Sequence, residues 1–80
     1  MEVTLENVKS IFKEEVDKRV NVENMDPDKS MSDQGVDSLD RSSAFMALED
    51  NFNVTISDLD MEKLDTLNKI VDFIKANQNS

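Results

Sequence analysis

Apolar residues recur every three or four positions in three separate stretches of this chain. Spacing of this kind places side chains on one face of a helix, and no stretch shows the apolar–polar alternation of a half-buried strand. In the first stretch the apolar face consists of Leu5, Val8, Ile11, Phe12 and Val16. The pattern predicts helices over about 3–18, 38–51 and 66–76, with a short one over 58–63. We therefore expect an all-α fold.

The single proline and the single glycine both fall between residues 20 and 36. Pro27 and Gly35 stand there among Asn, Asp and Ser residues, which interrupt any helical period. The sequence predicts a long loop between the first two helices, and loops of this length in compact domains are often functional. Eighty residues leave room for one domain with a limited core. We expect residues 1–80 to form a four-helix bundle with a flexible tail at 77–80.

Two residue types that carry much enzyme chemistry are missing. The chain has no cysteine and no histidine, so it lacks a thiol nucleophile, a disulfide and the commonest metal ligand. This composition argues against thiol enzymes, most hydrolases and zinc sites. We expect no catalytic residue, no metal site and no enzymatic activity.

The charge of the chain is strongly negative. Eighteen acidic and nine basic residues give a net charge of −9, and residues 33–65 alone hold nine acidic residues against two basic ones, a net −7. Such a surface repels nucleic acid and anionic membranes and attracts basic protein surfaces. Residues 1–20 carry four glutamates, and no run reaches membrane-spanning length. We expect a cytoplasmic monomer that is not inserted in a membrane.

Ser38 stands at the predicted start of the second helix, directly after Asp37. A helix N-terminus presents unpaired N–H groups and a partial positive charge, which favour a phosphate ester. No histidine or lysine base lies within the motif, so another enzyme would have to modify Ser38. Taken alone, the tripeptide Asp-Ser-Leu is short and common, and an ordinary helix cap is the better interpretation of Ser38.

A longer run around this serine, Gly-Val-Asp-Ser-Leu-Asp at 35–40, resembles the attachment motif of acyl carrier proteins. Residues 46–52, Met-Ala-Leu-Glu-Asp-Asn-Phe, are similar to the end of that family's second helix. Further similar segments follow in the family's order, at 6–16, 56–58, 62–64 and 72–74. The resemblance spans about residues 3–76 and implies a four-helix bundle of acyl-carrier type.

The resemblance implies that Ser38 carries 4′-phosphopantetheine, added from coenzyme A by a phosphopantetheinyl transferase. The thiol of that arm would hold acyl groups as thioesters and present them to enzymes of fatty acid, lipid or polyketide biosynthesis. Gly35, Asp37, Leu39 and Asp40 would complete the attachment motif. The implied partners are the transferase and acyl-loading, condensing and other biosynthetic enzymes with basic docking patches.

The resemblance also implies a docking surface and an acyl-chain pocket. The docking residues would be Leu39, Asp40, Arg41, Ser42, Met46, Glu49 and Asp50. The pocket would be lined by Phe45, Leu48, Ile56, Leu64 and Ile70. The same apolar residues are also expected to form ordinary core.

Four positions depart from the family pattern. Gln34 replaces a leucine, Ser42 and Ser43 replace an apolar and an acidic residue, and Arg41 places a cation beside the attachment turn. These departures fit neutral drift, or a dedicated carrier of a specialised polyketide or lipid pathway. Peptidyl and D-alanyl carriers share the architecture, but the Met-Ala-Leu-Glu run favours an acyl carrier.

Two other classes of function compete with the carrier. A calcium-binding loop is suggested by the spacing of Asp26, Asp28, Ser30, Gln34 and Asp37. However, Met31 stands where an EF-hand turn requires glycine, and Asp37 stands where it requires a bidentate glutamate. The second competitor is a subunit that keeps the fold without carrying cargo, against which the intact Asp-Ser-Leu motif argues.

Overall fold

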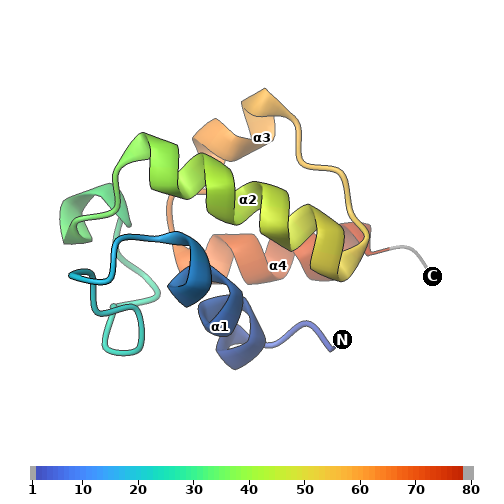
Figure 1. Ribbon diagram of the computed structural model, residues 1–80. Coiled ribbons are helices and arrows are strands. Elements are labelled where there is room, and N and C mark those ends of the chain that lie inside the picture. The colour runs from blue at the N-terminus through green and yellow to red at the C-terminus, as the bar shows by residue number, and fades with distance from the viewer. Residues whose placement is uncertain (1, 79–80) are drawn as a thin grey trace.

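The computed structural model describes residues 2–78, and four α-helices make up most of it. The helices are α1 (Leu5–Glu15), α2 (Ser38–Phe52), α3 (Asp58–Lys63) and α4 (Leu67–Asn77), and a 3₁₀ turn, η1, spans Ser32–Gln34. In Figure 1, α2 runs across the molecule, and the long loop gathers at the end where α2 and α4 begin. The described residues contain no strand, which confirms the predicted all-α fold.

The first helix is shorter than predicted. Thr4 adopts an extended conformation (φ −129°, ψ 159°), and its side chain accepts a hydrogen bond from the N–H of Asn7, so Thr4 is the N-cap. At the other end Val16 is extended (φ −95°, ψ 163°). The expected range of 3–18 was therefore too long. Val3 and Val16 lie outside the helix, but their side chains are still buried in the core.

The second and third helices lie close to their predicted bounds. α2 continues one residue further than expected, to Phe52, and its C-cap Asn53 takes a left-handed conformation with φ 57°. α3 has the predicted range. A capping box stabilises its start, because Ser57 accepts from the N–H of Asp60 and the Asp60 carboxylate accepts from the N–H of Ser57.

The fourth helix begins one residue later than predicted. Thr66 is its N-cap, with the side chain accepting from the N–H of Lys69. The helix continues to Asn77, and Gln78 is its C-cap. Of the tail predicted to be flexible, residue 77 is therefore helical, and residues 79–80 lie outside the described residues.

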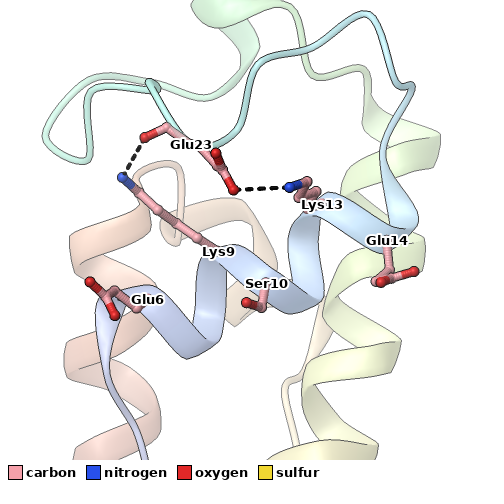
Figure 2. Close-up of a pocket in the computed structure, with 6 residues that line it drawn as sticks. All are labelled: Glu6, Lys9, Ser10, Lys13, Glu14 and Glu23. Carbon is pink, nitrogen blue, oxygen red and sulfur yellow. Dashed lines mark hydrogen bonds and ion pairs between the residues drawn. The ribbon is translucent and has the colours of Figure 1, made fainter.

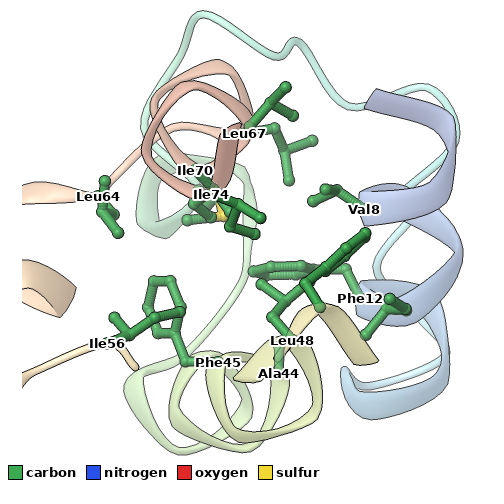
Figure 3. Packing of buried hydrophobic residues seen from close by; sticks show 14 of the residues in the cluster. Val8, Phe12, Ala44, Phe45, Leu48, Ile56, Leu64, Leu67, Ile70 and Ile74 are labelled. Carbon is green, nitrogen blue, oxygen red and sulfur yellow. The ribbon is translucent and has the colours of Figure 1, made fainter. Parts of the chain in front are cut away.

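The core lies where α1, α2 and α4 meet (Figure 3). Phe12 of α1 and Phe45 of α2 are fully buried, and their rings pack edge to face with centroids 6.3 Å apart and an interplanar angle of 82°. Such an arrangement is favoured because the positive edge of one ring meets the negative face of the other. Leu67, Ile70 and Ile74 close the core from α4.

The long loop is fastened to the helices by buried side chains and backbone hydrogen bonds. Met31 is fully buried, and its N–H donates to the carbonyl of Asp65 over 2.8 Å. The N–H of Asn68 donates to the carbonyl of Pro27 over 3.0 Å. The segment ahead of α2 is therefore held against the start of α4. Across the described residues, none of the helices has the length and apolar character needed to cross a bilayer.

Candidate functional site

Ser38 is the first residue of α2 and its side chain is exposed. The cap of the helix is Asp37, whose carboxylate accepts from the N–H of Asp40 over 2.9 Å. The carbonyl of Asp37 accepts the first helical bond, from the N–H of Arg41 over 3.0 Å. Within the described residues, no hydrogen bond engages the Ser38 hydroxyl. The capping role therefore belongs to Asp37, and the Ser38 hydroxyl faces solvent.

The geometry at Ser38 fits a phosphoester. The N–H groups of Ser38 and Leu39 open the helix and have no carbonyl partner within it, so they favour a negative charge at this end. The Asp37 carboxylate accepts from the N–H of Asp40, so within the described residues the N–H groups of Ser38 and Leu39 are left without a side-chain acceptor. A primary hydroxyl with this exposure can accept the phosphate of 4′-phosphopantetheine without a rearrangement of the core.

Gly35 turns the chain from the loop into the attachment segment. It has φ 100°, a conformation that residues with a Cβ rarely adopt, and its N–H donates to the carbonyl of Ser32 over 3.3 Å. An added Cβ would meet only Val20 at 3.8 Å, so the backbone conformation and not crowding requires glycine here. Val36 follows as a buried residue that anchors the start of α2.

Asp40, predicted to belong to the attachment motif and the docking surface, is half-buried and joins two elements. Its Oδ2 accepts a hydrogen bond from the N–H of Asp17 over 3.0 Å, which connects the first turn of α2 to the end of α1. The Arg19 guanidinium and the Arg19 N–H both donate to the carboxylate of Asp17. These bonds lower the pKa of the Asp17 carboxyl to about 2.

Some of the predicted docking residues are exposed to solvent, and the others make contacts within the molecule. Leu39 and Met46 are 78% and 58% exposed, and Ser42 and Asp50 are also exposed. Such large apolar side chains in solvent on one helix are typical of a protein-binding surface. The structure therefore leaves these four side chains accessible on α2.

The remaining docking residues make contacts within the molecule. Glu49 is half-buried and accepts from the N–H of Ile56 over 2.8 Å, so it fixes the connection between α2 and α3. The Arg41 guanidinium lies 6.0 Å from the centroid of the Phe45 ring. A cation over an aromatic face at this distance is attracted by the ring's electrons.

Leu59 of α3 is a further exposed apolar residue, and the sequence analysis did not identify it. It is 70% exposed, comparable to Leu39. Its signal in the sequence was its place between the two acidic residues Asp58 and Asp60. An apolar side chain between two carboxylates at the start of a short helix faces solvent.

The five residues predicted to line an acyl-chain pocket are part of the core. They come from α2, the α2–α3 connection, the C-cap of α3 and α4, and they face one another in Figure 3. None is more than 6% exposed. The structure brings them together as tightly packed core, which is the alternative role that the sequence also indicated.

A surface hollow lies elsewhere, between α1 and the long loop (Figure 2). Its volume is about 490 Å³, and it is lined by Glu6, Lys9, Ser10, Lys13, Glu14 and Glu23. Glu23 accepts from Lys13 through its carboxylate over 2.9 Å and from Lys9 through its backbone carbonyl over 3.1 Å. No predicted site residue lines this hollow, and its charged walls do not suit an acyl chain.

The residues of the possible calcium loop are committed to other bonds. Asp26 accepts from the N–H of Asp28 over 2.9 Å, and Asp28 accepts from the side chain of Asn68 over 2.6 Å. The Gln34 side chain bonds to backbone groups of the loop. Within residues 2–78, no three acidic, histidine or cysteine residues gather closely enough to hold a metal ion.

Comparison with known proteins shows which family this chain is similar to. Residues 6–74 match the family described as "Phosphopantetheine attachment site". The acyl carrier proteins of Buchnera aphidicola subsp. Acyrthosiphon pisum, strains Tuc7 and 5A, are each 41% identical over 71 residues, 88% of this chain and 86% of theirs. The acyl carrier protein of Cyanidium caldarium is 46% identical over 43 residues, 54% of this chain and 50% of that protein. The chain therefore belongs to the acyl carrier protein family, whose prosthetic group is 4′-phosphopantetheine.

Proposed function

We propose that residues 1–80 act as a single carrier domain that holds acyl groups as thioesters on a 4′-phosphopantetheine arm attached to Ser38. One observation carries this assignment: the Ser38 hydroxyl is exposed at the start of α2, while Asp37 performs the capping. Ser38 also lies inside the matched residues 6–74.

Attachment of the arm is a phosphoryl-group transfer from coenzyme A. The Ser38 oxygen forms the new phosphoester bond, and the bond to the departing 3′,5′-ADP breaks. The Ser38 proton passes to a base of the transferase, because the surrounding motif offers no histidine or lysine. When attached, the arm supplies the thiol that this cysteine-free chain lacks.

The test of the attachment is the intact mass of the purified protein. We expect incubation with coenzyme A and a broad-specificity phosphopantetheinyl transferase to add one arm per chain. A folded protein that stays unmodified under these conditions would contradict the proposal.

Partner enzymes dock, in our proposal, on the exposed apolar side chains of α2 and α3. Leu39 and Met46 supply contact area beside the attachment serine, and Leu59 adds to it from α3. The net charge of −9 attracts basic surfaces and raises the rate of encounter. The proposed partners are the transferase and the acyl-loading and condensing enzymes.

Replacing Leu39 with alanine should weaken docking and leave the fold intact. Leu39 is 78% exposed, so its truncation removes little packing within the molecule. Full burial of a leucine against a partner is worth about 1.5–3 kcal/mol, so we expect the KM of the transferase for this protein to rise at least about tenfold. Alanine at Asn77, an exposed residue of α4 whose side chain bonds to the carbonyl of Phe73, is the control and should leave KM unchanged. A KM equal to that of the wild type would remove Leu39 from the docking surface.

Ser42 favours a dedicated carrier within this function. It is exposed on α2 between Leu39 and Met46, where carriers of fatty acid synthesis typically present an apolar side chain. We expect a housekeeping fatty acid synthase to elongate the loaded protein several-fold more slowly than its own carrier. Equal elongation rates would contradict the dedicated role and indicate a general fatty acid carrier.

A further inference from the structure

The side chain of Gln34 makes an unusual number of hydrogen bonds for a half-buried loop residue. Its Oε1 accepts from the N–H of Asp26 over 2.8 Å. Its Nε2 lies within hydrogen-bonding distance of three carbonyl oxygens, those of Asp26 (3.0 Å), Lys29 (3.1 Å) and Ser30 (3.3 Å). One side chain thus joins the two ends of residues 26–30, which we call the 26–30 loop.

The 26–30 loop is in turn attached to the start of α4. The side chain of Asn68 donates to the Asp28 carboxylate over 2.6 Å, and the N–H of Asn68 donates to the carbonyl of Pro27 over 3.0 Å. Because α4 is packed into the core, these bonds hold the loop against a rigid element.

The backbone of Gln34 leads directly to the attachment segment. Its N–H donates to the carbonyl of Met31, the fully buried anchor of this region, over 3.0 Å. The same carbonyl accepts from the N–H of Val36 over 3.1 Å. Gly35, with φ 100°, lies between them, and Ser38 follows two residues after Val36. A side chain fixed at Gln34 therefore restricts the course of the chain into α2.

We propose that Gln34 is a positioning residue that fixes the presentation of Ser38 to the modifying enzyme. The inference rests on the proposed function, in which Ser38 receives the arm. A leucine at this position, as the family usually has, would have a similar volume but could make none of the four side-chain bonds. Gln34 is thus this chain's own means of holding the loop ahead of the attachment turn.

Replacing Gln34 with leucine should lower the fraction of molecules whose attachment segment is correctly placed. The apparent affinity for a partner falls in proportion to that fraction. We expect the KM of the transferase for this protein to rise about tenfold with kcat unchanged. The amide hydrogen of Asp26, which loses its Gln34 acceptor, should exchange with solvent at least about tenfold faster.

Two further variants separate positioning from a merely structural role. Asn24→Leu removes an amide from an exposed position of the same long loop and should change neither KM nor amide exchange. Asn68→Leu loosens the 26–30 loop from α4 while keeping Gln34, and should raise KM about threefold. It provides the same test if Gln34→Leu does not fold.

The outcomes distinguish this inference from the proposed function. An unmodified wild type, or full modification of Ser38→Ala, would overturn the attachment site itself. If Ser38→Ala is inert but the folded Gln34→Leu and Asn68→Leu variants keep the wild-type KM, the positioning role alone is overturned. A lower melting temperature with unchanged KM has the same meaning, because it shows that Gln34 contributes only to stability.

Discussion

Replacing Ser38 with alanine should abolish attachment of the phosphopantetheine arm and leave the protein folded. The Ser38 side chain is exposed, and Asp37 caps α2, so the hydroxyl contributes little to the stability of the helix. Alanine is also the most favourable residue for a helix. We expect the intact mass of Ser38→Ala to remain unchanged after incubation with coenzyme A and the transferase, with a wild-type circular dichroism spectrum.

Two other serines of α2 are matched controls for this experiment. Ser42 and Ser43 lie one turn further along the helix and carry the same hydroxyl. The variants Ser42→Ala and Ser43→Ala should each accept one arm, because Ser38 alone among the three serines of α2 lies in the first turn, beside the unpaired N–H groups. Modification of Ser38→Ala, or loss of modification in either control, would assign the attachment to another residue.

The helices could be predicted because the residues that define each helix lie close together in the sequence. Apolar spacing defined the inward faces, and Asp37, Ser57 and Thr66 are good caps next to such faces. The end of α1 was predicted wrongly because it depends on a distant residue. The N–H of Asp17 donates to Asp40, 23 positions away, and no local pattern reveals that partner.

In the candidate site, too, the features set by nearby residues could be predicted, and the contacts with distant residues could not. Exposure of Leu39 and Met46 followed from their place on a helix face away from Phe45. In contrast, the hydrogen bond that Glu49 accepts from the N–H of Ile56 could not be predicted from the sequence. The structure of the α2–α3 connection decides which N–H group needs an acceptor, and the docking role of Glu49 stays a prediction.

Two of the four departures from the family pattern have an explanation inside the molecule. Gln34 bonds to the 26–30 loop, and Arg41 lies against the Phe45 ring. Neither departure therefore needs a specialised partner enzyme to explain it. Ser42 makes no such contact and is exposed on α2, so it carries the argument for dedicated partners.

Replacing Phe12 with alanine should cause the largest loss of stability among the variants considered. Phe12 is fully buried between α1 and α2, where it packs edge to face against Phe45. Truncation of a buried phenylalanine costs about 3–5 kcal/mol, because it removes buried area and leaves a cavity. A chain of 80 residues has a free energy of unfolding of only about 4–12 kcal/mol, at about 0.05–0.15 kcal/mol per residue.

The melting temperature measures this loss directly. At about 4–8 °C per kcal/mol for a domain of this size, Phe12→Ala should melt at least about 12 °C below the wild type. Phe73→Ala is the matched control: Phe73 is half-buried on α4, so its truncation removes less buried area and should lower the melting temperature less. Equal shifts in the two variants would contradict the placement of Phe12 at the centre of the core. The Phe12–Phe45 contact joins α1 and α2 from the inside, while Ser38 and Leu39 lie exposed on α2.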